Sequence, residues 1–325
     1  MEKRKLNFGS WVISLLVTLL LVLASPVGKG YSGDVDPVDK KAFFDALVDT
    51  EDATQREIST KLLAVVPWYD TLNDNRLHGS SLKWEHPDDP SNSRILVETL
   101  LDKWAYDKFY RDHIGEEGYL LTRNLWVTVV PEMKNFFIGK TCPPSLKRIV
   151  QVKGLNPARL VKENPDDNYS IIVELWVYPK DLFRPTPDPE IRDHEGELSV
   201  KIDGNWTFPS DYNAFLTLIE NESYKPASFK DWFAKNVDYN RKGEDVSKWG
   251  SAWTRLGYTY DWGNPDDHVG LSEFIILLKA SGGLEVKLEK AIDSAKPGEW
   301  DNYFRCVAEG TSGSGGGGCF TKTCD

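Results

Sequence analysis

Residues 171–178 read Ile-Ile-Val-Glu-Leu-Trp-Val-Tyr, and this stretch decides the fold class. Short runs of β-branched and aromatic side chains that are bounded by turn-forming residues predict β-strands. In an extended chain Ile171 and Val173 point to one face of the sheet, and Ile172 points to the other. Because both faces carry apolar side chains, the pattern predicts an inner strand that is covered on each side.

Other segments of the later chain show similar patterns. Strands are predicted over residues 125–130, 253–262 and 271–278, and short helices over 211–219 and 228–237. The prolines at positions 179, 185, 187 and 189 predict an extended, non-helical segment between them. Residues 120–308 are therefore expected to form an α+β domain built on a mixed or antiparallel sheet.

The chain before residue 120 has a mainly helical pattern, so residues 25–119 are expected to form a helical region. Between residues 93 and 113, Leu96, Leu100 and Trp104 recur four residues apart, and Ser93 suits the N-cap position. A second helix is predicted over residues 53–66, followed by a polar loop at 73–93.

The first 24 residues have the three parts of a secretory signal peptide. Three basic residues at positions 3–5 precede an apolar run from Trp11 to Ala24, and small or turn-forming residues follow. This run has 14 residues, whereas a membrane-spanning helix needs about 20. The pattern predicts cleavage after Ala24, no permanent membrane span, and a secreted, periplasmic or otherwise extracytoplasmic location.

The composition indicates an acidic globular protein. The 325 residues carry a net charge of −11, and loss of three basic residues and one acidic residue with the signal peptide lowers it to about −13. Such a surface repels phosphate backbones and anionic lipid, so nucleic acid is not an expected partner. The 12 Trp, 13 Tyr and 14 Phe residues can supply a large apolar core.

Four cysteines in an exported chain allow two disulfides, in three possible connectivities. Cys319 and Cys324 follow a glycine run and are the expected terminal pair, which leaves Cys142 to join Cys306. Residues 309–325 are predicted to form a flexible Gly-rich tail that the folded core does not need.

No metal site is predicted. The chain has no His-Glu-x-x-His motif, and its five histidines are not spaced as paired ligands. The acidic segment at 188–197 has enough carboxylates for calcium but lacks the spacing of a calcium loop, so a solvated acidic loop is the expected structure.

A candidate site comes from the segment at 253–278. As strands, this segment places Arg255 and Asp261 on one face, Tyr258 and Tyr260 on the other, and Glu273 among aliphatic side chains. A carboxylate in such surroundings is paired, protonated or placed at the rim of a cleft. Arg255 or Arg184 is its expected partner. Either Glu273 and Arg255 form a fixed structural ion pair, or the carboxyl is catalytic.

Two blocks within residues 120–306 resemble a family of largely uncharacterised bacterial proteins, many of them exported or toxin-like. The first is ELWVYPKDLFRPTPDPEI at 174–191, and the second is WTRLGYTYDWG at 253–263 with GLSEFI at 270–275. The resemblance implies common descent but no defined activity. A small immunity-like protein is a partner that it implies.

The segment Ser-Glu-Phe-Ile-Ile at 272–276 is also similar to the glutamate strand of ADP-ribosyl transferases, although no Ser-Thr-Ser strand accompanies it. That similarity implies NAD as a substrate, with Glu273 on a ribose hydroxyl, Arg255 or Arg184 on the phosphates, and Tyr258 or Tyr260 stacked on nicotinamide. Two hypotheses follow: an exported effector that acts on NAD by ADP-ribosyl transfer or glycohydrolysis, and a non-catalytic extracytoplasmic binding or envelope-associated protein. A cleft where Arg255, Tyr258 and Glu273 converge favours the enzyme.

Overall fold

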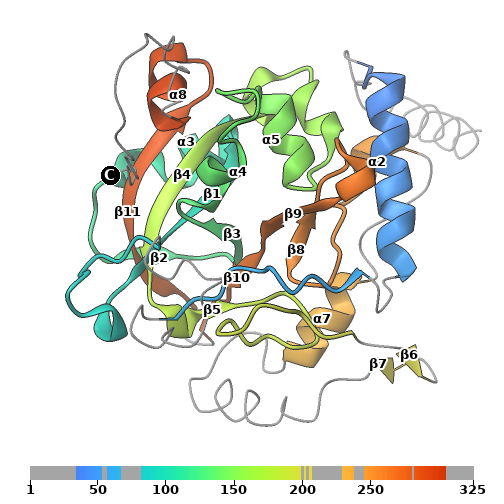
Figure 1. Cartoon of the computed structure of the whole chain (residues 1–325). Helices are drawn as coiled ribbons and strands as arrows, with labels where there is room; N and C mark the ends of the chain where they lie inside the picture. Colours follow the sequence, from blue (N-terminus) through green and yellow to red (C-terminus); the bar gives the residue numbers. More distant parts are fainter. Residues whose placement is uncertain are drawn as a thin grey trace, which may run out of the picture.

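The computed structural model describes residues 34–52, 57–66, 82–198, 201–202, 205–206, 229–237, 245–279 and 282–304. Over these residues the chain is α+β, as predicted, with a curled antiparallel sheet of seven strands (Figure 1). None of the helices in the described ranges is both long enough and apolar enough to cross a membrane. The predicted signal peptide, the helix expected at 211–219 and the Gly-rich tail lie outside the described residues.

The seven-stranded sheet confirms the predicted inner strand. Its order is β2 (Tyr119–Leu121), β11 (Leu284–Asp293), β4 (Tyr169–Val177), β1 (Ile95–Asp102), β3 (Leu125–Val129), β10 (Phe274–Ile276) and β5 (Leu182–Phe183). β4 lies between β11 and β1, and it pairs with β1 from Ile95 opposite Val177 to Asp102 opposite Tyr169. β3 confirms the strand predicted at 125–130.

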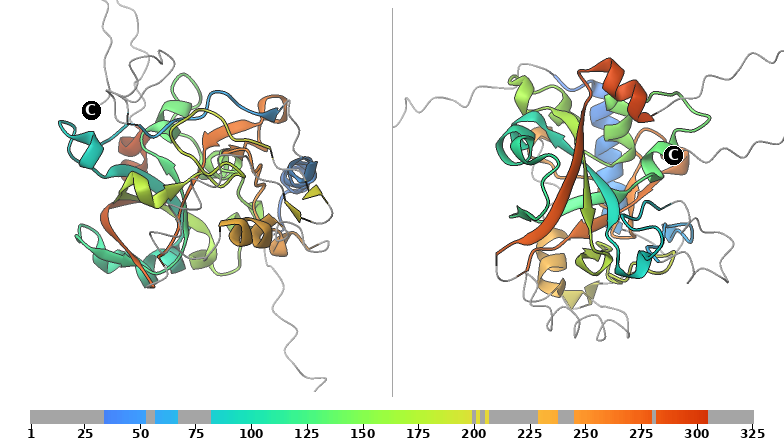
Figure 2. Two further views of the ribbon diagram at one scale, coloured as in Figure 1. Left: turned by 90° about the horizontal axis from the view of Figure 1, so that it is seen from below. Right: turned by 90° about the vertical axis from the view of Figure 1, so that its left-hand side faces the viewer.

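Within the described residues, two small ladders and six α-helices complement the sheet. The ladders pair β6 (Lys201–Ile202) with β7 (Asn205–Trp206), and β8 (Tyr258–Tyr260) with β9 (Val269–Ser272). The helices are α2 (Pro37–Asp49), α3 (Lys103–Phe109), α4 (Glu132–Phe136), α5 (Leu146–Val152), α7 (Phe229–Val237) and α8 (Pro297–Phe304). Helix α7 confirms the helix predicted at 228–237. Figure 2 shows α8 at the end of the long β11.

Short 3-10 turns occur throughout the described chain. They are η1 (Thr50–Asp52), η5 (Pro90–Asn92), η6 (Arg111–His113), η7 (Pro157–Leu160), η8 (Pro165–Asp167), η9 (Pro179–Asp181), η10 (Val246–Lys248) and η11 (Pro265–Asp267). Five of them have proline at the first helical position, which suits a residue with fixed φ and no N–H donor.

The sheet has a different apolar core on each face. One face packs a large cluster that includes Val97, Val173 and Phe274. The other face packs Leu100 and Ile172 against α4, α5 and α8, and a third cluster gathers Ile275 with Trp253 and the aromatic residues of α7. The candidate site lies on this second face, between two apolar clusters.

The helix predicted at 93–113 is wrong over its first half. Residues 95–102 form β1, and a helix starts only at Lys103, where the Asp102 side chain accepts from the N–H of Ala105 at 2.6 Å. A continuous apolar run fits a buried helix as well as a strand covered on both faces, and here pairing with β3 and β4 decides. Because β1 is central to the sheet, no domain boundary falls at residue 119.

The second predicted helix is also absent where the structure describes its segment. Residues 58–66 are extended or bent, and their backbone bonds to the 191–194 loop: the N–H of Leu62 donates to the His194 carbonyl at 3.0 Å and that of Val65 to the Ile191 carbonyl at 2.7 Å. This partner was not visible in the sequence, because it lies far away along the chain.

The strand predicted at 253–262 is interrupted by a turn. Arg255 has a φ of 63° and Gly257 a φ of 79°, so the chain reverses there and only residues 258–260 form β8. An isolated bridge pairs Trp253 with Thr259 across this turn. The predicted alternation of faces from Trp253 to Trp262 is therefore wrong.

Candidate functional site

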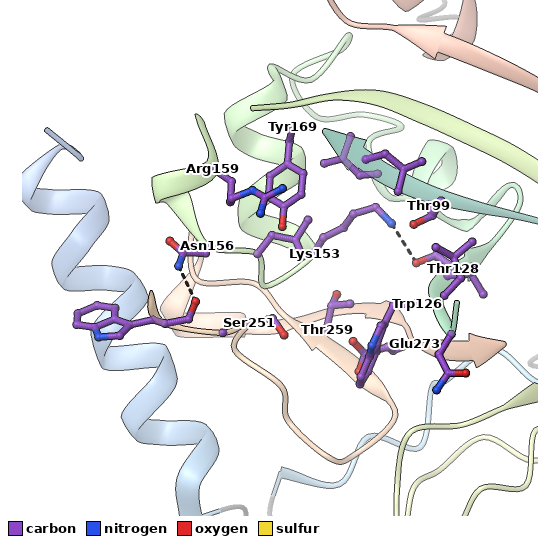
Figure 3. A pocket seen from close by; sticks show the side chains of 18 of the residues that line it. Thr99, Trp126, Thr128, Lys153, Asn156, Arg159, Tyr169, Ser251, Thr259 and Glu273 are labelled. Carbon is purple, nitrogen blue, oxygen red and sulfur yellow. Dashed lines mark hydrogen bonds between the residues drawn. The ribbon is translucent and has the colours of Figure 1, made fainter. Parts of the chain in front are cut away.

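A pocket of about 470 Å³ lies on the face of the sheet that carries the second and third clusters (Figure 3). Strands β1 and β3, the end of α5, the η7 turn and the loop after η10 line it. The labelled lining residues are Thr99, Trp126, Thr128, Lys153, Asn156, Arg159, Tyr169, Ser251, Thr259 and Glu273. Glu273 is the predicted site residue that reaches this pocket.

Glu273 occupies the junction of two sheets. Strand β9 before it pairs with β8, whereas β10 after it pairs with β3 and β5 of the main sheet. The chain changes partners at this residue, and its backbone N–H donates to the Gly257 carbonyl at 2.9 Å. Residue 273 belongs to neither β-ladder, so its side chain can turn into the pocket.

The carboxyl of Glu273 lacks a compensating contact. Its Oε2 atom is buried and has no hydrogen-bond partner in the described structure. Burial raises the pKa of Glu273 from 4.5 to about 8, and the positive charge of Lys153 lowers it by less than burial raises it. The raised pKa favours the protonated form of this carboxyl at neutral pH.

Lys153 connects the pocket to a row of polar side chains across the sheet. It caps the C-terminus of α5, and its Nζ donates to Glu98 at 2.7 Å and to Thr128 at 3.3 Å. Glu98 lies opposite both Thr128 on β3 and Glu174 on β4. Val127 pairs with Phe274, so the register places Thr128 beside Glu273 at the end of this row.

At the other end of this row of polar side chains, Glu174 on β4 is also ionisable. Lys134 and Lys290 lie 3.4 Å and 3.2 Å from the two carboxylate oxygens of Glu174. Burial raises the pKa of Glu98, although Lys153 opposes the shift, and its Oε2 has no hydrogen-bond partner in the described chain. Glu98, Glu174 and Lys153 are buried in this row, whereas Lys134 is partly exposed and Lys290 is half-exposed. Charged groups are seldom fully buried unless they are paired.

A fourth carboxyl fixes the chain next to Glu273. Glu132, at the first turn of α4, accepts through one oxygen from the N–H of Ser272 at 2.9 Å and from its hydroxyl at 2.7 Å. Burial raises the pKa of Glu132 to about 7, and the two bonds from Ser272 oppose this rise. Glu132 thus positions the backbone that carries Glu273.

Three further basic side chains line the pocket, those of Arg159, Lys162 and Lys248, and Lys248 pairs with Asp245. Trp126 lies beside Glu273, because it is opposite Ile275 on β10 (Figure 3). Arg159 pairs with Asp102, and its guanidinium lies 5.2 Å from the ring of Tyr169. A cationic pocket on a chain of net charge −11 favours a small anionic ligand over a neutral one.

The other predicted site residues of this segment lie elsewhere. The Arg255 guanidinium donates to the carbonyls of Thr50 and Glu51, and the cation whose charge acts on Glu273 is Lys153. The hydroxyls of Tyr258 and Tyr260 donate to the Glu57 carbonyl at 3.0 Å and to Asp49 at 2.8 Å. The turn at residues 255–257 explains this placement, because it sends Arg255 away from the strand face on which it was predicted.

Arg184 and Asp261 have structural contacts. Arg184 is fully buried and donates to the carbonyls of Glu190 and Asp193, both at 3.0 Å. The acidic segment at 188–197 therefore wraps a buried guanidinium and is not simply a solvated loop. Asp261 is fully buried and receives both arms of the Arg148 guanidinium. Cys142 is the only one of the four cysteines among the described residues.

Sequence reasoning missed Lys153, Glu98 and Glu132 as members of the site. Glu98 offered a signal, because it interrupts the apolar run of residues 95–101. Lys153 and Glu132 offered none, since each is a single charged residue at the end of a short helix.

Comparison with known proteins returns no match to a family model, a curated protein or a solved structure. The resemblance of the blocks at 174–191 and 253–275 to toxin-like bacterial proteins therefore stays a prediction.

Proposed function

We propose that the pocket binds a small anionic molecule and that the protein is an enzyme in which Glu273 transfers a proton to or from that molecule. The observation that carries the proposal is the buried carboxyl oxygen of Glu273, which faces the pocket without a hydrogen-bond partner in the described structure. Strongly perturbed carboxyls in pockets mark candidate catalytic acids and bases.

The chemistry of the surrounding groups supports this role. A carboxyl with a pKa of about 8 is a proton donor at neutral pH. Once it has given up its proton, the nearby ammonium of Lys153 stabilises the carboxylate that remains. Lys153 is held in place by Glu98 and Thr128, so this stabilising charge is already in position before the reaction.

NAD is the most concrete ligand of this class. Its phosphates suit the basic side chains of Arg159, Lys162 and Lys248, and the indole ring of Trp126 offers a surface for a planar base. In glycohydrolysis, water adds to the ribose carbon, the bond to nicotinamide breaks and one proton is released. In that reaction Glu273 would hold a ribose hydroxyl as a carboxylate.

The two forms of the proposal differ in pH dependence. If Glu273 donates a proton, kcat/KM falls as the pH rises through about 8, because the donor is lost. If the carboxylate holds the ribose of NAD, turnover of NAD rises over the same interval. The direction of the pH profile therefore identifies the role of Glu273.

The second candidate function is non-catalytic binding of the same ligand class. It is favoured by the internal ion pairs of Lys153 and Arg159, which could serve only to shape the pocket. A protein that binds the ligand tightly and leaves it unchanged over long incubation would fit this function.

Export and a partner protein complete the proposal. The sequence of residues 1–24 supports secretion, and the even number of cysteines fits an oxidising compartment. An exported enzyme that acts on a common metabolite would need a small immunity-like protein in the producing cell. Sequencing the amino terminus of the secreted protein tests cleavage after Ala24.

The proposal is tested by titrating the purified protein with NAD, ADP-ribose and inorganic pyrophosphate, and by following release of nicotinamide. We expect saturable binding of at least one anion, and loss of turnover in Glu273→Gln with the fold intact. Glu285→Gln, which changes an exposed glutamate of β11, is the matched control and should keep full activity. Absence of binding by all three anions would refute the assignment of the pocket.

A further inference from the structure

Three potential metal ligands meet on the side of the β8–β9 hairpin that faces α2. Asp49 is the last residue of α2, Glu57 follows the η1 turn, and His268 ends the η11 turn between β8 and β9. One ligand atom from each side chain lies within 4.8 Å of the other two. None of these residues lines the pocket at Glu273.

A separate small cavity lies among these ligands. Its volume is about 10 Å³, and its lining includes Asp49, Glu57 and His268 together with Tyr258 and Tyr260. A cavity of this size holds about one small atom or ion and no organic molecule. The ligands thus surround a space of the right size for a single cation.

Aromatic side chains hold the three ligands in place. The ring of His268 stacks on that of Tyr260 with centroids 4.6 Å apart and planes inclined by 3°. The Tyr260 hydroxyl donates to Asp49 Oδ2 at 2.8 Å, and the Tyr258 hydroxyl donates to the carbonyl of Glu57 at 3.0 Å. At metal sites, hydrogen bonds from neighbouring residues orient the side chains that coordinate the ion.

The electrostatics of the cluster favour a positive ion. Two of the three ligands are acidic side chains, and a divalent cation would balance their negative charge. Asp49 is exposed, so an ion can enter from solvent.

We propose that Asp49, Glu57 and His268 bind a divalent transition-metal ion of the zinc type. One imidazole nitrogen with two carboxylates suits zinc, which takes four ligands and can complete its shell with water. Calcium fits less well, because it needs six to eight oxygen ligands. The ion would tie α2 to the β8–β9 hairpin, the elements that stand side by side in Figure 1.

The test uses the purified full-length protein without a polyhistidine tag, stripped with a chelator and titrated with zinc chloride by calorimetry. We expect one zinc ion to bind per chain and to raise the melting temperature. Cobalt should give a visible absorption spectrum from the same site. His268→Gln and Asp49→Asn should each weaken zinc binding by at least about tenfold, because loss of supporting residues alone has effects of this size.

Two controls keep the outcome specific. His113→Gln removes an exposed histidine that lies 2.6 Å from Glu116 and should leave zinc affinity unchanged. Glu273→Gln should also leave it unchanged, so failure of the metal site and failure of the proposed enzyme are distinguishable. Asp49→Asn keeps an oxygen acceptor for Tyr260, and near-UV circular dichroism checks that each variant is folded. The proposal is overturned if wild-type protein binds no zinc, binds calcium more tightly, or is unaffected by both ligand changes.

Discussion

Asp261 and Glu273 are two acidic residues of one chain segment with opposite surroundings. Asp261 is fully buried, both of its oxygens bind the Arg148 guanidinium, and one also accepts from the N–H of Gly263 at 3.1 Å. Glu273 has a buried oxygen with no hydrogen-bond partner in the described structure. Both carboxyls have buried oxygens. Asp261 is paired with a cation, Arg148, which indicates a structural role, whereas Glu273 has no such bound partner among the described residues and is the candidate catalytic residue.

Helix α5 supplies the cation in each case. Arg148 lies in its first turn and is engaged by Asp261, whereas Lys153 caps its other end and donates to Glu98 and Thr128. The positive charge of Lys153 therefore acts on Glu273, although Lys153 donates its hydrogen bonds to Glu98 and Thr128. Burial outweighs that charge, so the pKa of Glu273 stays raised and its carboxyl is left available to a ligand.

The largest expected effect comes from removing the partner of Asp261. Arg148→Met leaves a buried carboxylate uncompensated and should lower the free energy of unfolding by about 3–5 kcal/mol. Chemical denaturation at pH 7 measures it. The double variant Arg148→Met, Asp261→Asn should recover part of the loss. A single variant as stable as wild type would show that Asp261 does not depend on its ion pair, and the comparison with Glu273 would fail.

The second prediction concerns Glu273 and its dependence on pH. Its pKa is about 8 in the folded protein and 4.5 ordinarily, so the folded state holds the proton more tightly. The stability that this protonated carboxyl contributes is complete below pH 4.5 and is lost as the pH rises through 8. Glu273→Gln, which cannot ionise, should match wild type at pH 5 and exceed it by about 2–4 kcal/mol at pH 8.5.

Denaturation curves at the two pH values measure this difference. Glu285→Gln, on the exposed side of β11, should change stability by less than about 0.5 kcal/mol at both. If Glu273→Gln changes the free energy of unfolding equally at pH 5 and pH 8.5, the pKa of Glu273 is not raised. The contrast between Glu273 and Asp261 would then be wrong.

The smallest effect is expected at Ser272, which joins Glu132 to the backbone next to Glu273. Its hydroxyl donates to Glu132 at 2.7 Å and accepts from the N–H of Leu63 at 2.7 Å. Ser272→Ala removes both bonds and should lower the free energy of unfolding by about 1–2 kcal/mol. The backbone bond from Ser272 to Glu132 remains, so a loss as large as that of Arg148→Met would contradict this ranking.

The sequence was informative where local pattern and tertiary environment agree. Strands β3 and β4 and helix α7 were predicted, because turn residues bound them and their apolar side chains repeat with a clear period. Strand β1 was predicted as a helix, because apolar spacing in a run buried on both faces fits either structure. For the site, the sequence pointed to Glu273 but paired it with Arg255.

The sequence by itself determined the α+β class, the inner strand β4 and the presence of an acidic residue among aliphatic neighbours at position 273, since these depend on composition and on the period of neighbouring side chains. Only the tertiary structure decided the partners. A turn at Arg255 sends that guanidinium to Thr50, α5 brings Lys153 close enough for its charge to act on Glu273, and folding of α2 beside the hairpin gathers Asp49 with His268. Contacts between distant segments follow from packing, which local periodicity does not encode.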